Sequence, residues 1–247
     1  VLREALAIDE EVLKSSESDL ERALYALARA YEAKGRLDRA ELIFKQLLAK
    51  DEEVFGKENV SLAGPALPSL ASIYVAQEKF SEAESLYKRG FAAILKNSDE
   101  EDPSVPFGMN MLAEFYLDRG RYSEAAPLVE AALSIYRDQG RTEGPGLATA
   151  LTNRGRLLAA DKRYAEAEPL LLKALELYRE FFLKNPAIIV TMKSLADLYL
   201  EQGRNSEAET WYEKSLESQK EFWGASHYQV GLASKHLAEL RDRLEGR

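Results

Sequence analysis

The feature that most constrains the fold of this chain is a pattern that returns about every 42 residues. Each copy holds an apolar helical stripe, a break, and a second helical stretch that opens on an alanine. These alanines are Ala40, Ala83, Ala125, Ala167 and Ala208, so the spacings are 43, 42, 42 and 41 residues. A unit of two helices cannot bury its apolar face alone, and stacked copies bury a continuous core. The sequence therefore predicts an all-α solenoid of helical hairpins.

The first helix of each unit carries large and small apolar residues at i, i+3, i+4 and i+7, which is the period of one buried helical face. The first copy reads Leu24, Leu27, Ala28, Tyr31. The fourth copy departs from this pattern, because Arg154 and Gly155 take the places of Leu and Ala. Two interpretations of Arg154 are open: it reaches a partner, or its aliphatic stem packs along a neighbouring helix with the charge in water. We favour the second.

The break between the two helices predicts a left-handed residue in three copies, where Gly35, Gly120 and Gly203 stand. Glu78 and Lys162 occupy the same place in the other two copies, and for these we expect a different turn geometry. Capping-box pairs follow the break and predict where the second helices start. These pairs are Asp38 with Glu41, Ser81 with Glu84, and Ser206 with Glu209.

These signals predict a single solenoid domain over residues 1–247. Residues 1–14 are expected to form the second helix of a truncated repeat. Five full hairpins are expected at about 20–55, 63–97, 104–138, 146–183 and 187–222, and a terminal capping helix at 229–244. Because the chain begins inside a repeat, we interpret it as part of a longer protein.

Composition excludes several classes of function. The net charge is −9 and the basic residues are scattered, so the clustered Lys and Arg that a nucleic-acid partner needs are missing. No apolar run approaches the roughly 18 residues that cross a bilayer, so membrane insertion is not expected. The chain has no Cys, and its two histidines, His227 and His236, have no third ligand at a metal-binding spacing. We expect no cofactor, no metal and no catalysis.

The repeated pattern Leu-x-x-Leu-Ala-x-x-Tyr, then Gly, then Ala-x-x-x-Phe or Tyr resembles the tetratricopeptide repeat. The unit here is longer than the usual ~34 residues, and this longer form resembles the repeats of kinesin light chains and related bacterial proteins. The linker Trp223-Gly224-Ala225-Ser226-His227 is similar to that family's Leu-Gly-x-x-His linker. The resemblance implies a right-handed superhelix whose first helices line a concave groove that holds peptides or partner proteins. It also implies that Asn residues midway along the first helices clamp a peptide backbone, and here Asn110 and Asn153 occupy such places.

The repeat register also gives the residues expected to face that groove. They are polar or aromatic side chains beside the buried stripes, and such side chains can bind peptide backbone or carboxylate groups. The candidates are Arg22, Tyr25, Arg29, Asn110, Glu114, Thr152, Asn153, Arg156, Lys193 and Lys235.

Three functions remain open on the sequence. The leading hypothesis is a non-catalytic scaffold that binds a peptide or partner protein in the concave groove. The second is self-association or docking within a longer chain, through an uncovered apolar face on the N-terminal helix that would give a homo-oligomer. The third is a regulatory arm of an enzyme whose catalytic domain lies outside this sequence.

Overall fold

The computed structural model describes residues 17–60, 64–99, 102–181 and 186–245. Within these ranges every regular element is a helix. The helices are α2 (Glu17–Ala33), α3 (Leu37–Phe55), α4 (Ala66–Ala76), α5 (Phe80–Asn97), α6 (Ser104–Asp118), α7 (Tyr122–Asp138), α8 (Pro145–Ala160), α9 (Tyr164–Phe181), α10 (Ala187–Glu201), α11 (Asn205–Trp223) and α12 (Tyr228–Glu245).

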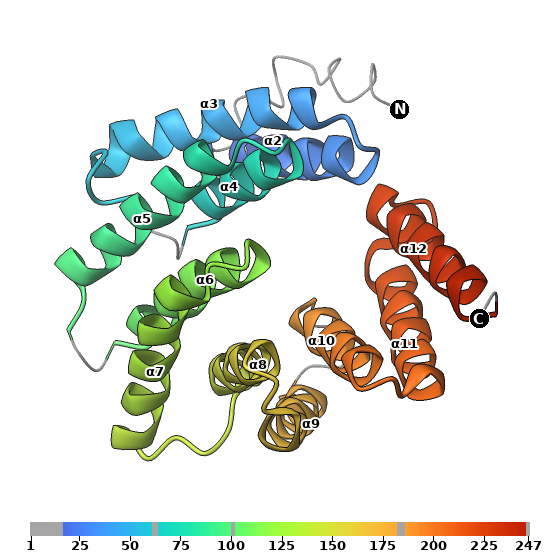
Figure 1. The fold of residues 1–247 in the computed structure, drawn as a ribbon. Helices are drawn as coiled ribbons and strands as arrows, with labels where there is room; N and C mark the ends of the chain where they lie inside the picture. The colour runs from blue at the N-terminus through green and yellow to red at the C-terminus, as the bar shows by residue number, and fades with distance from the viewer. Residues whose placement is uncertain (1–16, 61–63, 100–101, 182–185, 246–247) are drawn as a thin grey trace.

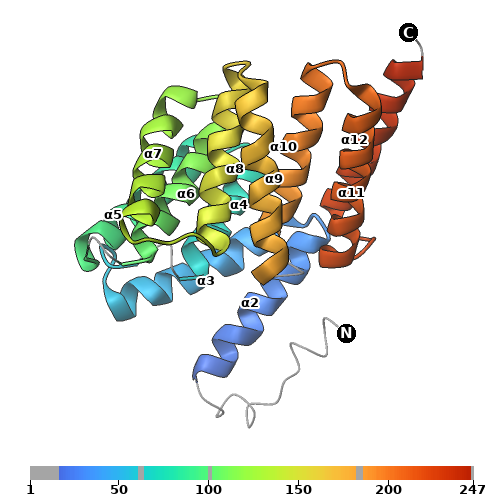
Figure 2. The same cartoon turned by 90° about the horizontal axis from the view of Figure 1, so that it is seen from below.

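The helices pack in chain order, each against the next, and the array bends into a curve (Figure 1). Helices α6, α8 and α10 lie on the inner side of this curve, and α7, α9 and α11 lie on the outer side. Figure 2 shows α8 to α11 standing side by side, with α2 and α3 crossing near their lower ends. The all-α solenoid predicted from the repeat is confirmed.

The core follows the repeated positions. The five alanines that define the repeat are completely buried, so the two helices of each hairpin approach closely at this point. The leucine of the first-helix stripe is also buried at Leu70, Leu112 and Leu195. In the fourth hairpin Gly155 takes the place of the stripe alanine, and a Cβ there would lie 2.7 Å from Leu171 Cγ on α9. Only glycine therefore allows α8 and α9 to pack at this distance.

The two ends of the curve touch each other. A Cβ placed on Gly35, at the end of α2, would lie 3.6 Å from Cβ of Tyr228 at the start of α12. Burial raises the pKa of Tyr228, and the negative charge of Glu32 on α2 raises it further. The start of α12 thus touches the end of α2, whereas the main packing partner of α12 is α11.

The prediction of two kinds of turn is wrong. Gly35, Gly120 and Gly203 have φ of 68°, 68° and 72°, but Glu78 and Lys162 are also left-handed, at 61° and 59°. The backbone hydrogen bonds explain this result. Arg36 N–H donates to Tyr31 O, and Lys79 N–H and Arg163 N–H donate in the same way to Tyr74 O and Leu158 O. The hairpin geometry imposes the left-handed residue even where the side chain disfavours it.

The predicted capping boxes are also wrong. Helices α3, α5 and α11 begin at Leu37, Phe80 and Asn205, one or two residues before the expected positions, and their N-caps make no side-chain hydrogen bond. The glutamates of the supposed boxes instead bind basic residues elsewhere in the array. Glu41 pairs with Lys79 at 2.9 Å, and Glu84 pairs with Arg121 at 2.5 Å. These contacts join one hairpin to the next.

One prediction falls on residues that the structure does not describe. The helix predicted over residues 1–14, on which the self-association hypothesis depends, lies outside the described residues. Among those that are described, no helix is both long and apolar enough to cross a membrane.

Candidate functional site

The ten groove candidates lie on α2, α6, α8, α10 and α12, which are first helices of their hairpins together with the terminal helix. The structure does not gather them into one site. Five polar residues on the neighbouring helices α6 and α8 do form a contiguous group, which we call the α6–α8 polar cluster. Its members are Asn110, Glu114, Asp118, Asn153 and Arg156.

The two asparagines of this cluster connect helices to each other. Asn110 Nδ2 donates to the Gly146 carbonyl of α8 at 3.0 Å, and Asn153 Nδ2 donates to the Asn110 carbonyl of α6 at 3.4 Å. Their exposed fractions are 3% and 1%. The sequence placed both on an open groove surface, and the structure corrects this, because adjacent first helices pack close enough to cover them. Asn110 Oδ1 has no hydrogen-bond partner in the described part of the chain.

Thr152 is covered for the same reason, with an exposed fraction of 2%. Its hydroxyl donates to the Ala148 carbonyl at 3.0 Å and lies 2.8 Å from the Thr191 hydroxyl of α10. Thr152 therefore joins α8 to α10, just as the asparagines join α6 to α8. Thr191 was not among the sequence candidates, because it stands 39 residues after Thr152 and so falls two residues short of the repeat spacing of 41.

Arg156 is the cationic member of the cluster. Its Nη2 donates to Asp118 Oδ1 at 2.5 Å, across from α8 to α6. Its Nη1 is buried and makes no hydrogen bond to any described residue. Sequence analysis missed Asp118. Other ion pairs of the structure also join residues 36 to 38 positions apart, such as Arg121 with Glu84, and this separation becomes visible only in the fold.

Glu114 is the acidic member of the cluster with a perturbed ionisation. It is half-buried on α6, one helical turn before Asp118. Burial and, to a smaller extent, the negative charge of Asp118 raise the pKa of Glu114, the positive charge of Arg156 lowers it, and the net result is a pKa of about 7. Near neutral pH this carboxyl group therefore holds a proton for a large part of the time, so it can both donate and accept hydrogen bonds.

The other candidates are dispersed. Arg22 and Tyr25 line a cavity of about 510 Å³ between α2, α3 and the start of α4. Arg29 pairs with Glu32 beside the contact between α2 and α12. Lys193 on α10 and Lys235 on α12 are exposed, and Lys235 lies 3.8 Å from Glu239. Among the described residues, no hydrogen bond or ion pair joins these side chains to the α6–α8 polar cluster.

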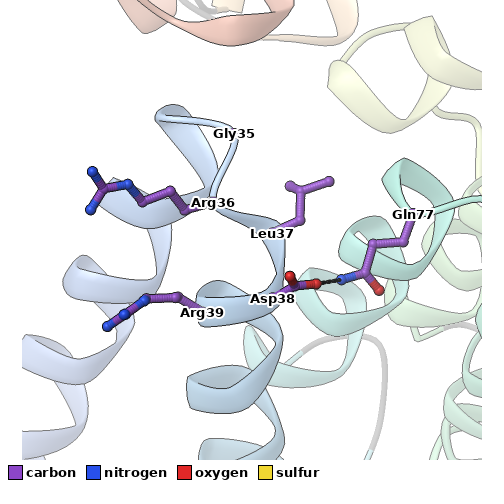
Figure 3. A pocket seen from close by; sticks show the side chains of 6 residues that line it. All are labelled: Gly35, Arg36, Leu37, Asp38, Arg39 and Gln77. Carbon is purple, nitrogen blue, oxygen red and sulfur yellow. Dashed lines mark hydrogen bonds between the residues drawn. The ribbon is translucent and has the colours of Figure 1, made fainter.

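A larger hollow of about 660 Å³ lies at the turn between α2 and α3 (Figure 3). Gln77 Nε2 donates to Asp38 Oδ1 across it at 3.3 Å, whereas Arg36 and Arg39 point away from this pair. Its polar side chains do not converge on a common point. It therefore offers less specific chemistry than the α6–α8 polar cluster.

The histidines have structural contacts. The His227 ring is stacked between the rings of Trp223 and Tyr228, at centroid distances of 5.3 and 5.1 Å. The His236 ring makes an edge contact with Tyr212. Within the ranges that the structure describes, no group of three His, Cys, Asp or Glu residues could hold a metal ion.

Comparison with solved structures supports the fold. A putative kinesin light chain from Podosopora anserina with nearly identical repeats aligns with a TM-score of 0.53 and 24% identity, covering 81% of this chain and 94% of that one. A thermophilic repeat protein of Thermus thermophilus aligns with a TM-score of 0.53 and 24% identity, covering 86% and 98%. A Rap protein complexed with Competence and Sporulation Factor aligns with a TM-score of 0.63 and 17% identity, covering 98% and 68%. At these identities the likeness concerns the fold alone.

A search of curated proteins finds no match to this chain. Family models give a clear assignment. Models described as tetratricopeptide repeat match residues 23–58, 66–97, 104–180 and 146–221, which together cover most of the sequence. The chain belongs to the tetratricopeptide-repeat family.

Proposed function

We propose that this chain is a non-catalytic scaffold that binds a segment of another protein on its inner surface, over the α6–α8 polar cluster. Its family is one of protein-interaction repeats, which supports the general role. The Rap protein with the same fold was solved with Competence and Sporulation Factor, so a solenoid of this kind can hold a bound factor.

The observation that carries the proposal is the half-satisfied guanidinium of Arg156. Asp118 fixes one end of this group, and Nη1 at the other end has no hydrogen-bond partner in the described chain. An unpaired buried donor costs about 1–3 kcal/mol. A carbonyl or carboxylate oxygen from a partner would recover that energy after a small rotation of the guanidinium.

Glu114 gives the same surface an adaptable partner for a peptide. Because its pKa lies at about 7, the side chain can change protonation state with little energy when a ligand arrives. A peptide backbone offers one donor and one acceptor in each residue. The guanidinium of Arg156 on α8 can bind the peptide carbonyl, and the carboxyl group of Glu114 on the neighbouring helix α6 can bind the peptide N–H.

The test is to capture partners from a lysate of the source cells with wild-type chain, Arg156→Gln and Arg163→Gln. Arg163 is a matched control, because it is exposed and pairs only with Glu166 of its own helix among the described residues. We expect Arg156→Gln to lose a partner that Arg163→Gln retains. Equal capture by all three proteins would contradict the proposed site.

A further inference from the structure

The outer face of the solenoid carries a ladder of ion pairs that is interrupted once. The residue after the repeat alanine is a glutamate that binds the turn of the following hairpin. Glu41 pairs with Lys79, Glu84 pairs with Arg121, and Glu168 pairs with Arg204 at 3.1 Å. In the third hairpin this position is Ala126. Arg163, at the matching turn, pairs with Glu166 of its own helix instead.

The first-helix stripe breaks at the same junction between the third and fourth hairpins. Arg154 occupies the position that Leu70, Leu112 and Leu195 fill in other hairpins, where the side chain is buried. Arg154 instead extends to Glu130 on α7 and forms an ion pair. The open question about Arg154 is thereby answered in part, because its guanidinium binds a neighbouring helix.

A cleft of about 490 Å³ lies beside the second of these interruptions, and Arg154 and Glu130 both line it. It is bordered by α7, the loop that joins α7 to α8, α8 and α9. We call it the α7–α9 outer cleft. Its apolar lining comes from four half-buried leucines on three helices. These are Leu133, Leu147, Leu151 and Leu170. A volume of this size lies in the range of ligand-binding pockets, about 300–1,000 Å³.

The polar part of the lining is basic, in a protein whose net charge is −9. Three arginines border the cleft against one glutamate. Glu130 offsets Arg154, and Glu166 also lies within its electrostatic reach. Arg137 and Arg141 are exposed, and neither forms an ion pair with any residue that the structure describes. The uncompensated charge therefore lies at these two residues.

We propose that the α7–α9 outer cleft binds a segment of a partner protein in which an acidic residue stands next to a large apolar one. The apolar side chain enters between the leucines, and the carboxylate lies between Arg137 and Arg141. Charge complementarity and the apolar floor together select this chemistry, since guanidinium groups bind carboxylates through paired hydrogen bonds. The cleft shares no lining residue with the α6–α8 polar cluster, so this inference does not depend on the proposed function.

The experiment begins with a library of random twelve-residue peptides displayed on phage and selected on the immobilised chain. Enriched peptides are synthesised with a fluorophore, and their dissociation constants are measured by fluorescence polarisation. Arg137→Glu/Arg141→Glu is the test variant. Arg179→Glu/Lys220→Glu is the matched control, with the same change of charge at exposed residues near the ends of α9 and α11. Thr142→Trp, at the cleft lining, is a second variant that narrows the entrance without changing charge.

We expect enriched peptides with Asp or Glu beside Leu, Ile or Phe. Charge reversal in the cleft should weaken their binding at least tenfold, Thr142→Trp should also weaken it, and the control pair should leave it within twofold. The proposal is overturned if no peptide is enriched, if the enriched peptides are basic, or if the cleft variants bind them like wild type. Peptides that respond to Arg156→Gln but not to the cleft variants would also overturn it, while supporting the inner surface.

Another occupant is a second copy of the chain. Sedimentation velocity over a range of concentrations would then show a dimer that Arg137→Glu/Arg141→Glu abolishes. That result would replace the partner protein with self-association and would contradict the proposal as stated.

Discussion

Asn153→Ala tests whether the buried polar residues of the first helices join helices or bind a partner. Asn153 is 1% exposed and donates to the Asn110 carbonyl at 3.4 Å. The net contribution of a hydrogen bond to the free energy of unfolding is about 0.5–1.5 kcal/mol, and a bond of this length lies near the lower end of that range. Removing the amide also leaves a void of roughly 25–30 Å³, which costs about 0.7 kcal/mol at 24 cal/mol per Å³. We expect a loss of about 1–2 kcal/mol in the free energy of unfolding.

Asn110→Ala should cost less than Asn153→Ala, although it removes the shorter bond to Gly146. The reason is that Asn110 Oδ1 is buried without a hydrogen-bond partner in the described chain, and the substitution removes this unsatisfied acceptor. Asn97→Ala is a control, because Asn97 is exposed at the end of α5 and surface substitutions usually stay within about 0.5 kcal/mol.

The assay is urea unfolding followed by circular dichroism, combined with hydrogen exchange of α6 and α8. The local measurement is needed because repeat arrays can unfold in parts, so one global free energy can miss a weakened interface. We expect faster exchange in α6 and α8 of Asn153→Ala. The reasoning would be refuted if Asn153→Ala were as stable as Asn97→Ala, with unchanged exchange, and yet lost its partner.

Two further predictions concern the turns and the ionisation of the cluster. Glu78→Gly and Lys162→Gly should each raise the free energy of unfolding by about 0.5–1 kcal/mol, because both residues have a left-handed backbone that glycine adopts without strain. Gly203→Ala should lower the free energy of unfolding by a similar amount, measured in thermal melts. No atom lies within 4 Å of the added Cβ, so only backbone strain opposes this substitution. Equal melting temperatures for all three variants would contradict the turn geometry. Folding raises the pKa of Glu114 from its ordinary value of 4.5 to about 7, so between these pH values the folded state binds more protons than the unfolded state. The contribution of Glu114 to the free energy of unfolding therefore falls as the pH rises through this window. Glu114→Gln should therefore gain stability relative to wild type at pH 8 but not at pH 4, by up to about 3 kcal/mol before solvent screening is allowed for. A pH-independent difference between the two proteins would count against this ionisation.

The repeat pattern predicted the fold because several independent sequence signals all indicate the same helical hairpin. The spacing of the alanines, the apolar stripes and the glycines at three turns all indicate two packed helices per unit. Glu78 and Lys162 show the limit of local propensity, because hydrogen bonds of the hairpin override it. The helix starts were misplaced for a related reason. Glu41 and Glu84 act between hairpins, and a local capping motif cannot reveal that.

The site was harder to predict than the fold. The repeat register correctly placed Asn110, Thr152 and Asn153 on first helices. It does not predict how closely two neighbouring first helices approach each other. Burial of these three side chains depends on that distance. Asp118 was missed because it matters only through its contact with Arg156, which joins residues from two hairpins. The outer cleft is lined by residues of α7, α8, α9 and the loop between α7 and α8, so only the assembled array reveals it.

The most direct test of the account is a photo-crosslinking experiment on the inner surface. A benzoylphenylalanine is introduced in place of Lys193, which is exposed on α10, or in place of Lys220, which is exposed on the outer helix α11. Irradiation in a lysate of the source cells should join a partner to the Lys193 position, and Arg156→Gln in the same chain should remove that adduct. An adduct at Lys220 alone, or one at Lys193 that survives Arg156→Gln, would contradict binding over the α6–α8 polar cluster.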